Sequence, residues 1–386
     1  MTTETVKGFK DFTGEEAEKR EEIRKILVDS FQKYGFEPAE TPVVEYREFV
    51  QGNNTDDEAV SSVFKLQDRG KRDLALRYEF TFQLKRLMID KKLPYKRYAI
   101  GPVFRDEPIS GNRLRQFTQC DIDTVGATIK DEAEILAVVK RVLDSLKIKF
   151  KILINNRKLL NEILEKENIE KMDWENVIRE IDKLDKLDKD EVYNNLRGYG
   201  AQNLLEIFKK SEGYFKKYTS YSEIKELKQY CQYYGVEVVF SPSLARGLSY
   251  YNGSVFEVKS DIKETITAGG SFMFNDVQST GISFGLERLS ILTKSFSKNE
   301  KTMIVSIGED EKAVEIAEKL RNEGLSCVIF YNKITKALDY ANSQNIKYVL
   351  ILGGDEVKKK LVKFKNMASG KESLLNFNEI LKEIKL

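Results

Sequence analysis

The sequence predicts an α+β protein made of an antiparallel-sheet domain, a mostly helical insertion and a small C-terminal α/β domain. Strand-like runs dominate the first part of the chain, a Lys-, Glu-, Asn- and Leu-rich stretch without alternation follows, and strands then alternate with helical segments. Such alternation is typical of α/β folds. The predicted bounds are 1–158 and 236–300 for the sheet domain, 159–235 for the insertion and 303–386 for the last domain.

The composition is that of a globular chain with more than one domain. Charged residues make up 33 % and hydrophobic residues 41 % of the 386 positions, which supports a sizeable core. No apolar run is long enough to span a bilayer, and residues 1–16 lack the apolar core of a signal peptide. The three cysteines lie far apart without a C-x-x-C pair, which predicts buried free thiols at Cys120, Cys231 and Cys327. A cytoplasmic location is expected.

The absence of histidine from the sequence narrows the chemistry. It excludes His-assisted nucleophiles, imidazole proton shuttles and imidazole metal ligands together. Any reaction must therefore use carboxylates, arginines, phenols and the backbone. The formal net charge of +2 excludes a strongly basic protein, so contacts with nucleic acid would need local patches.

The first part of the chain begins with an amphipathic helix and continues as strands. Apolar residues recur at helical spacing from 15 to 34, and Gly35 ends the pattern. The proline-bounded segment 38–44 indicates a strand at a sheet edge or an interface. Four strand-like runs follow, at 63–66, 74–78, 98–105 and 115–125. Residues 68–71 have the composition of a hairpin turn, so the sheet is expected to be antiparallel.

Strand signals return after the insertion. Runs at 236–240 and 255–259 and a strand-to-helix sequence at 281–295 complete the sheet domain, and 296–301 indicates a linker. The last domain contains three strand-like runs separated by two helical segments. These runs are 303–308, 325–330 and 348–353.

The runs 98–105 and 115–125 are joined by a polar loop and carry the first candidate site. Arg105 and Glu107 share one face of the first strand, because side chains alternate with period two. The second strand places four side chains on one face: Phe117, Gln119, Asp121 and Asp123. An antiparallel pairing would gather a guanidinium for phosphate, an aromatic plane for a base, and amide and carboxylate groups for a polar substrate. From this segment alone, a hydrated sheet face with Arg–Asp pairs is the alternative.

Two further segments carry features suited to a ligand. The sequence 281–288 has glycines on one strand face, where a ligand could lie against the backbone, and Arg288 at the helix start could meet a nucleotide. The segment 244–257 places three candidate residues before a strand: Arg246, Tyr250 and Tyr251. Each segment alone has a plain alternative, namely a surface cap for Arg288 and core packing for the tyrosine pair.

Taken in order, these segments resemble the signature motifs of class II aminoacyl-tRNA synthetases, and specifically of histidyl-tRNA synthetases, over essentially the whole chain. The class motifs are matched by Gly8-Phe-Lys-Asp-Phe, by Tyr34-Gly-Phe with Thr41-Pro42, by Arg105 to Gln119, and by Gly285-Leu-Glu-Arg288. The segment Arg246-Gly-Leu-Ser-Tyr-Tyr matches the histidine-specific motif. The resemblance implies activation of L-histidine by ATP and its transfer to tRNA(His), a class II catalytic domain, an anticodon-binding domain at 303–386 and a homodimer.

The resemblance implies an ATP site made largely of arginines. Arg105 would contact the α-phosphate and the substrate carboxylate, while Arg113 and Arg288 would reach the outer phosphate. Glu107 and Phe117 would hold and stack the adenine. Mg²⁺ is expected to arrive with ATP, and no tightly bound metal or organic cofactor is expected.

The resemblance also implies a histidine site. Glu79 and Thr81 would hold the α-amino group with help from Gln119, while Asp123 and Tyr251 would recognise the imidazole. The full expected set is Glu79, Phe80, Thr81, Arg105, Gln119, Asp123, Arg246, Tyr250 and Tyr251.

Catalysis of this reaction needs charge neutralisation and alignment more than proton transfer, because a carboxylate attacks the α-phosphate in line. The expected catalytic residues are Arg246 and Arg105. Arg246 would stand where related enzymes place a metal ion near the α-phosphate.

The sequence departs from the family pattern at three places. Pro108 replaces the usual Arg after the motif Glu, and the loop 108–112 is shorter by a residue, which bears on acceptor-stem contacts. Ser271 follows Gly269 and Gly270 where the family has Arg. Ser249 replaces the commoner Asp.

Two non-catalytic alternatives share part of the pattern. A histidine-biosynthesis regulatory subunit binds histidine but charges nothing, and the domain at 303–386 argues against it. An RNA-binding sensor would not need the intact Arg105, Glu79 and Arg246. The basic cluster 358–365 could contact the tRNA backbone, although a solvated helix face is the simpler interpretation.

Overall fold

The structure is a computed structural model that describes residues 3–52, 60, 62–109, 113–184, 187–246, 250–262, 264–294 and 300–385. The chain forms two compact units, Met1–Phe296 and Ser297–Leu386, and each is described by itself. Among the described residues, no helix combines the length and apolar character that crossing a membrane requires.

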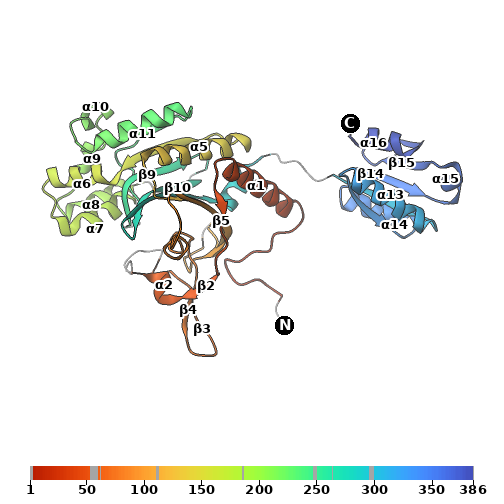
Figure 1. Ribbon diagram of the computed structural model, residues 1–386, viewed down its shortest axis with the longest axis horizontal. Helices are drawn as coiled ribbons and strands as arrows, with labels where there is room; N and C mark the ends of the chain where they lie inside the picture. The colour runs from red at the N-terminus through yellow and green to blue at the C-terminus, as the bar shows by residue number, and fades with distance from the viewer. Residues whose placement is uncertain are drawn as a thin grey trace. The chain divides into compact units, whose positions relative to one another are not determined.

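An eight-stranded sheet forms the centre of the first unit (Figure 1). Its strands, in order across the sheet, are β1 (Glu37–Pro38), β5 (Tyr95–Phe104), β6 (Gln116–Val125), β11 (Val277–Gly285), β10 (Thr267–Phe274), β9 (Tyr251–Lys259), β7 (Lys151–Asn156) and β8 (Val238–Phe240). All neighbouring pairs are antiparallel except the two edge pairs, in which β1 lies parallel to β5 and β8 parallel to β7. The predicted antiparallel sheet, with an edge strand at Pro38, is confirmed.

Helices cover one face of this sheet. The helix α1 (Gly14–Lys33) buries Ile23, Leu27 and Phe31 completely, because residues four apart share one helix face. It ends before Gly35, whose φ of +78° lies in the left-handed region that glycine tolerates. Alongside it lie α5 (Ile129–Ser145) and α12 (Leu286–Leu292), and the three helices pack with the sheet around one apolar core.

A small antiparallel sheet lies beside the large one. It consists of β2 (Val44–Tyr46), β4 (Asp73–Leu76) and β3 (Lys65–Gln67), with the short helices α2 (Arg47–Gln51) and α4 (Leu84–Leu87) nearby. The predicted hairpin turn lies between β3 and β4, where the Lys71 backbone N–H donates to the Asp68 carbonyl at 3.0 Å. A φ of +59° at Lys71 completes the turn.

The segment 159–235 is helical, as predicted. Its elements are α6 (Arg157–Lys166), η1 (Lys171–Asp173), α7 (Trp174–Ile181), α8 (Lys189–Arg197), α9 (Leu204–Ile207), α10 (Glu212–Phe215) and α11 (Tyr221–Tyr233). Helix α11 packs on α5, and the apolar side chains of the segment join the core of the large sheet. The segment therefore belongs to the first compact unit.

The second unit is a five-stranded sheet with helices on both faces. The strand order is β13 (Ser326–Phe330), β12 (Lys301–Ser306), β14 (Tyr348–Leu352), β15 (Val362–Asn366) and β16 (Glu372–Leu375). The helices are α13 (Asp310–Asn322), α14 (Ile334–Ser343), α15 (Gly354–Lys359) and α16 (Phe377–Lys385). Alternation along β12 directs Ile304 into one apolar cluster and Met303 and Val305 into the other.

The basic cluster of the second unit does not form one helix face, which corrects the simpler interpretation of the sequence. Helix α15 ends at Lys359, and Lys363 and Lys365 lie on β15. Both lysines form ion pairs with Glu372 of β16, at 2.8 and 2.9 Å. Their alternation with the buried residues of β15 is a strand pattern that the lysine run obscured.

Candidate active site

The candidate site lies on the face of the large sheet that the helices leave free. Along β6, Cys120 and Ile122 point into the helix-covered core, so the residues between and beside them face the other way. This open face carries the four side chains that strand geometry groups together: Phe117, Gln119, Asp121 and Asp123.

Small residues on the neighbouring strands leave room above these side chains. Asp121 lies between Ala99 of β5 and Ser283 of β11, and Gly281 is the β11 partner of Asp123. A Cβ atom at Gly281 would stand 2.0 Å from Oδ1 of Asp123, which no real side chain tolerates. Gly281, which was predicted to make room for a ligand, therefore makes room for the carboxylate of Asp123.

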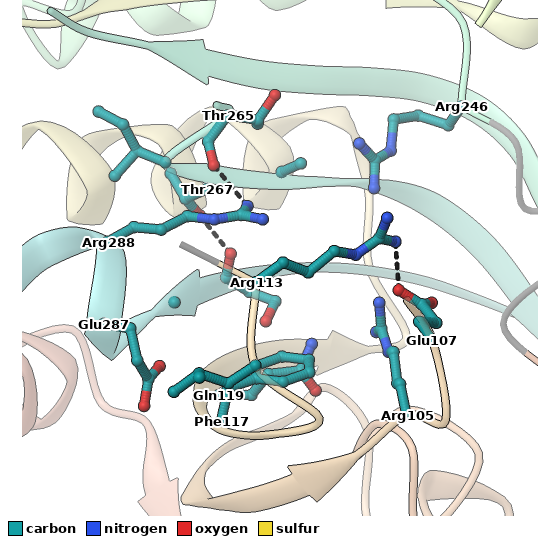
Figure 2. Close-up of a pocket in the computed structure, with 15 residues that line it drawn as sticks. Arg105, Glu107, Arg113, Phe117, Gln119, Arg246, Thr265, Thr267, Glu287 and Arg288 are labelled. Atoms are coloured by element: carbon teal, nitrogen blue, oxygen red, sulfur yellow. Dashed lines mark hydrogen bonds and ion pairs between the residues drawn. The ribbon is translucent and has the colours of Figure 1, made fainter. Parts of the chain in front are cut away.

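Two cavities open on this face. The first has a volume of about 180 Å³ and collects four arginines at its wall, as Figure 2 shows. Its lining comprises Arg105, Glu107, Arg113, Leu114, Phe117, Gln119, Arg246, Thr265, Ile266, Thr267, Ala268, Ser283, Gly285, Glu287 and Arg288. Four guanidinium groups around one small space make an anion-binding site.

Three of the four arginines of the first cavity, namely Arg105, Arg113 and Arg288, contact polar groups of its wall. Arg105 donates from Nε to the carbonyl of Tyr78 at 3.2 Å, and its guanidinium stands 5.3 Å from the ring centre of Phe117. Arg288 donates to the carbonyl of Thr265 at 2.6 Å. Arg113 forms an ion pair with Glu107 (Figure 2).

The arginines also repel one another. The pKa of Arg288 is lowered, first by burial and then by the charges of Arg105, Arg113 and Arg246, while Glu264 opposes the shift. A polyanion between these groups would remove the repulsion. The electrostatics thus favour a polyphosphate over a singly charged ligand.

Glu287 fixes the helix that presents Arg288. Its carboxylate accepts the backbone N–H of Thr118 on β6 at 3.0 Å and forms an ion pair with the buried Arg20 of α1, also at 3.0 Å. These contacts tie the start of α12 to the sheet and to α1. The backbone position of Arg288, the next residue, is therefore fixed.

The second cavity is smaller, about 70 Å³, and is lined by acids and phenols. The lining consists of Glu79, Thr81, Arg105, Gln119, Asp121, Asp123, Arg246, Tyr250, Tyr251, Ala268, Gly269, Phe272, Gly281, Ile282 and Ser283. Five residues line both cavities, and they are Arg105, Gln119, Arg246, Ala268 and Ser283. The two cavities are therefore adjacent, and Arg105 and Arg246 stand at the junction between them.

The acids of the second cavity are hard to ionise. Burial raises the pKa of Glu79 to about 7, against the opposing charge of Arg105. Burial likewise raises the pKa of Asp121 to about 7, and it raises the pKa of Asp123, although the Arg97 guanidinium counteracts both shifts. A cationic ligand would help these groups to ionise, so the cavity suits an ammonium group or another hydrogen-bond donor.

Two tyrosines close the second cavity, of which Tyr251 is buried and Tyr250 partly buried. The rings of Tyr250 and Tyr251 lie 4.7 Å apart, and burial raises the pKa of both phenols, so they stay protonated. Within the described ranges, no group of three or more Asp, Glu or Cys side chains lies close enough to hold a metal ion. The protein groups at the site are thus arginines, neutral phenols and carboxyls.

The structure places all but one of the sequence-predicted site residues on the walls of the two cavities. Phe80 is the exception, because its ring packs with Ala99 and Val103 beneath Phe117. Residues 110–112 of the shortened loop and residues 247–249, including Ser249, lie outside the described residues.

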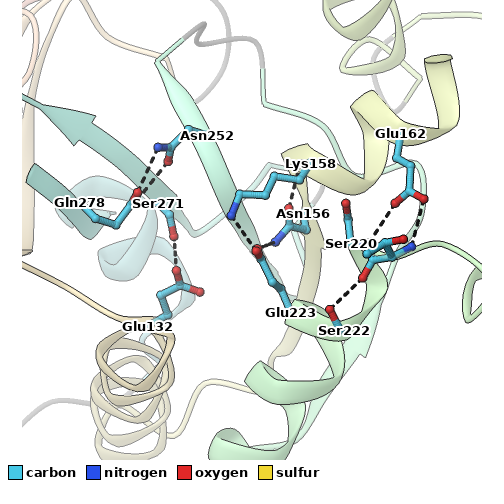
Figure 3. Close-up of polar contacts among 11 residues, drawn as sticks. Glu132, Asn156, Lys158, Glu162, Ser220, Ser222, Glu223, Asn252, Ser271 and Gln278 are labelled. Carbon is cyan, nitrogen blue, oxygen red and sulfur yellow. Dashed lines mark hydrogen bonds and ion pairs between the residues drawn. The ribbon is translucent and has the colours of Figure 1, made fainter. Parts of the chain in front are cut away.

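Ser271, which replaces the family's Arg, lies on the opposite face of the sheet from the cavities. Its hydroxyl donates to the buried Glu132 of α5, as Figure 3 shows. This departure from the family pattern therefore does not change the lining of either cavity.

Sequence reasoning missed two residues that shape the site, Arg97 and Thr265. Arg97 precedes the predicted strand and resembles a surface lysine or arginine in the run Lys96-Arg97, yet only 1 % of its surface is exposed. Thr265 precedes β10, which the glycine pair 269–270 concealed. Alternation carried backwards from Ala99 is the signal that could have placed Arg97 on the site face.

The comparisons with known proteins cover both units. A family model described as "Histidyl-tRNA synthetase" matches residues 8–289, and one described as "Anticodon binding domain" matches residues 301–386. "Histidine--tRNA ligase 1" of Bacillus anthracis is 34 % identical over 413 aligned residues, covering 96 % of this chain and 97 % of that protein. "Histidine--tRNA ligase" of Wolinella succinogenes is 32 % identical, with coverages of 96 % and 95 %.

Solved structures share the fold. The histidyl-tRNA synthetase from Nostoc sp. PCC 7120 superimposes with a TM-score of 0.86 at 24 % identity, covering 100 % of this chain and 99 % of that one. A protein titled "ATP phosphoribosyltransferase regulatory subunit/histidyl-tRNA synthetase from Bacillus halodurans C" gives 0.75 at 21 % identity, with coverages of 90 % and 98 %.

Proposed function

This chain belongs to the histidyl-tRNA synthetase family, and on that basis we propose how its two adjacent cavities carry out the family's reaction. The reaction has two steps. Histidine and ATP first form histidyl-adenylate and pyrophosphate, and histidine is then transferred to the 3′ end of its tRNA. The observation that carries the proposal is the junction: Arg105 and Arg246 line both the anion-type cavity and the carboxylate-lined cavity.

The first cavity is proposed to bind ATP. Phe117 and Glu107 would stack and hold the adenine, and Arg113 and Arg288 would engage the outer phosphates. Arg105 would meet the α-phosphate. The mutual repulsion of these arginines supports a polyphosphate ligand, because its charge would be compensated there.

The second cavity is proposed to bind histidine. Glu79, with Thr81 and Gln119, would accept the α-ammonium group, whose charge stabilises the ionised carboxylate. Asp123 and Tyr251 would contact the imidazole, with Tyr250 beside them, and Phe80 would support the site through packing.

The junction places the two substrates for in-line attack. A carboxylate oxygen of histidine forms a bond to the α-phosphorus of ATP, and the bond from that phosphorus to the pyrophosphate oxygen breaks. No proton has to move. Arg105 would hold both reacting groups, and Arg246 would stabilise the negative charge on the α-phosphate as the bond forms.

ATP is proposed to bind as its magnesium complex, in which phosphate oxygens hold the metal. The acidic residues of the first cavity, Glu107 and Glu287, are engaged by Arg113 and by Arg20. The metal would therefore enter with the nucleotide and neutralise part of its charge.

Amino-acid-dependent ATP–pyrophosphate exchange tests the proposal, with every standard amino acid offered to the wild type. Exchange is expected with histidine alone. Arg246→Ala should lower it roughly hundredfold to thousandfold, as expected for removal of one donor to a developing oxyanion. The control is Arg47→Ala, which removes a largely exposed arginine that pairs with Asp73. Neither residue lines a cavity, so exchange should remain unchanged.

Two results would contradict the proposal. Exchange with another amino acid would assign the second cavity to a different substrate. Histidine binding by a folded protein without any exchange would favour the non-catalytic, regulatory alternative. Charging of tRNA(His) is the next measurement once histidine-dependent exchange is established.

The rest of the chain is proposed to serve tRNA binding. Residues 301–386 match an anticodon-binding family, which supports a contact with the anticodon of tRNA(His). Residues 159–235 are proposed as an insertion domain within the catalytic domain at 1–158 and 236–300. Filter-binding of tRNA(His) to the full chain and to a variant lacking residues 301–386 checks the first assignment.

We also propose a cytoplasmic homodimer. The small sheet exposes apolar side chains at Val44, Tyr46 and Leu66, which are 43 %, 52 % and 40 % exposed and would be covered by a second copy. The free, buried thiols support a reducing compartment. Analytical ultracentrifugation should show dimers, and Tyr46→Asp should favour monomers. A wild-type monomer at all concentrations would contradict the homodimer.

A further inference from the structure

Arg97 lies behind the second cavity rather than in it. Its side chain is only 1 % exposed, and it is the largest fully buried side chain of the described residues. Nη2 forms an ion pair with Oδ2 of Asp123 at 2.7 Å and donates to the carbonyl of Phe80 at 3.1 Å. Arg97 does not line the cavity, so it would act on a ligand through its neighbours.

The strand register holds Asp123 in place between two different neighbours. Arg97 is its directly opposed partner on β5, and Gly281 is its partner on β11. Because Oδ1 occupies the space above Gly281 and Oδ2 faces the guanidinium, the carboxylate has one orientation. Opposed residues of an antiparallel pair are close enough for such an ion pair to be set by the register itself.

The charge around Arg97 is unbalanced. Three carboxyl groups, those of Glu79, Asp121 and Asp123, interact electrostatically with it. The other ionisable groups that interact with these carboxyls or with Arg97 are Arg77, Arg105, Tyr78 and Tyr95, with Tyr250, Tyr251 and Arg246 on the far wall. Of the cations, Arg105 and Arg246 stand at the junction with the first cavity, while Arg97 is paired directly with Asp123.

An arginine in this place is poorly explained by stability alone. Its Nε and Nη1 groups are buried without a hydrogen-bond partner, which costs free energy. A buried ion pair is often no more stabilising than an apolar pair of similar volume. The arrangement therefore suggests that the guanidinium is retained for its effect on the carboxylates.

We propose that Arg97 is a positioning residue that fixes the orientation and the negative charge of Asp123 and Asp121, and thereby sets how the second cavity recognises the side chain of its amino acid. The proposal rests on the proposed function, because it assigns the second cavity to histidine. Without Arg97, burial would raise the pKa of these carboxyls further, so a smaller fraction of them would be charged near neutral pH. A protonated carboxyl is a poorer acceptor for a ring N–H group than a carboxylate.

The sign of the expected pH effect follows from this argument. Removing a nearby cation raises the pKa of a carboxyl, so a higher pH is needed to form the carboxylate. The acidic limb of kcat/KM for histidine should therefore move to higher pH. Titration of the substrate's own imidazole is common to all variants and cancels in the comparison.

The test uses pyrophosphate exchange by the full-length protein over a range of pH. Arg97→Gln removes the charge but keeps a hydrogen-bond donor. It should raise KM for histidine roughly tenfold to hundredfold, as for the loss of a hydrogen bond to a charged group, and leave KM for ATP nearly unchanged. Its acidic limb should move up by about one pH unit or more. Arg97→Lys, which keeps the charge, should leave the limb near its wild-type position.

Two controls separate this effect from a general loss of packing. Arg157→Gln removes another buried arginine, which forms an ion pair with Glu175 of α7 at 2.8 Å. This variant should change neither KM value and should not move the acidic limb. Arg97→Met is the second neutral variant, and it carries the test if Arg97→Gln does not fold, as judged by circular dichroism.

The outcomes distinguish failure of this inference from failure of the proposed function. A wild type without histidine-dependent exchange would end the proposed function, and the inference with it. A wild type that exchanges, together with neutral variants that change kcat and both KM values equally at every pH, would overturn the inference alone. An equal shift of the acidic limb in Arg97→Lys would also overturn it, since charge would then not be the cause.

Discussion

Gly281 shows how the absence of one side chain shapes the site. Its place on β11 is directly opposite Asp123, and Oδ1 of that carboxylate fills the space where a Cβ atom would be. The backbone conformation at Gly281 is ordinary extended strand, so the need for glycine is spatial. A methyl group there would displace the carboxylate from its contact with Arg97.

We therefore expect Gly281→Ala to weaken histidine binding far more than ATP binding. The KM for histidine in pyrophosphate exchange should rise roughly tenfold or more, as for the loss of a charged hydrogen bond. Gly213→Ala on α10 is the control, because its new Cβ would find the nearest atom at 3.7 Å, an ordinary contact. An unchanged KM for histidine in Gly281→Ala would show that Asp123 does not contact the substrate.

The extent to which single residues could be predicted depended on where their partners came from. Phe117 and Gln119 lie on β6, and Arg105 directly follows the paired strand β5, so alternation was enough to group them. Alternation carried back from Ala99 could have placed Arg97 on the site face, but only its tertiary contacts with Phe80 and Asp123 reveal that it is buried. A basic residue is exposed by default unless a partner from elsewhere in the fold compensates it.

At the scale of elements, α12 depends on one carboxylate. Glu287 accepts the backbone N–H of Thr118 and pairs with Arg20, which is 8 % exposed. Loss of the carboxylate would leave the Thr118 backbone N–H without this acceptor and the buried Arg20 guanidinium with uncharged partners, the Thr118 hydroxyl and the Phe12 ring. Because Arg288 follows directly, the first cavity would also lose its fixed wall.

Glu287→Ala is expected to lower the free energy of unfolding by about 3 to 5 kcal/mol, the range for breaking a buried ion pair. The KM for ATP should rise more than the KM for histidine. Urea denaturation and exchange kinetics measure the two effects. For comparison, Asp73→Ala removes an exposed ion pair with Arg47 and should change stability by less than about 1 kcal/mol. Equal effects of the two variants would refute this role of Glu287.

A second element contact joins α5 to β10 through a buried acid. Glu132 of α5 is 7 % exposed and accepts the Ser271 hydroxyl, while its Oε2 has no hydrogen-bond partner (Figure 3). Burial raises the pKa of Glu132 to about 7, although hydrogen bonds from Ser254 and Ser271 oppose the shift. The protonated form therefore suits the folded state, and folding becomes less favourable as pH rises from the unfolded value through 7.

Replacing this acid by its neutral amide should stabilise the protein at alkaline pH. We expect Glu132→Gln to raise the free energy of unfolding by roughly 1 to 3 kcal/mol at about pH 8, and the gain should vanish near pH 4. Denaturant titrations at both pH values provide the measurement. Glu134→Gln on the same helix removes a partly exposed acid that pairs with Lys96, so it should give no such gain. A pH-independent gain in Glu132→Gln would point to packing instead of charge.

The bounds of helices and strands could be predicted where the residue pattern was simple. They could not be predicted where other residues hid the pattern. The helix from 15 to 34 matches α1 closely, because its apolar spacing and Gly35 act locally. The strand that was expected to begin at residue 98 begins at Tyr95, because the polar residues Lys96 and Arg97 hid the alternation at its start. The strand β10 was missed because its glycine pair indicates a loop until the flanking strands β9 and β11 are known.

At the scale of the whole molecule, the two units have separate cores. The large sheet and its helices share one apolar cluster, while the C-terminal unit contains its own clusters on the two faces of its sheet. Both cavities of the site belong to the first unit. The chemistry of activation can therefore be argued from the first unit alone, as far as the described residues show.

The absence of histidine from the chain makes its pH dependence unusually informative. With no imidazole in the protein, titration near neutral pH falls to buried carboxyls, and those of Glu79, Asp121 and Glu132 have pKa values raised to about 7. Glu79 and Asp121 line the second cavity, whereas Glu132 lies on the other face of the sheet. Stability should thus respond to pH through all three carboxyls, and activity through the two that line the second cavity.

Glu79→Gln and Glu132→Gln separate the two responses. Glu79→Gln should lower kcat/KM for histidine roughly tenfold to hundredfold, because a charge-assisted hydrogen bond to the α-ammonium group is lost. Its acidic limb should move to lower pH, since the charge of Glu79 no longer raises the pKa of Asp121. Glu132→Gln should leave that limb in place and flatten only the stability profile. Glu79→Gln should change both the kinetic limb and the stability profile, because the raised pKa of Glu79 also makes folding less favourable as pH rises. A kinetic limb that moves in Glu132→Gln would mean that the two faces of the sheet are coupled.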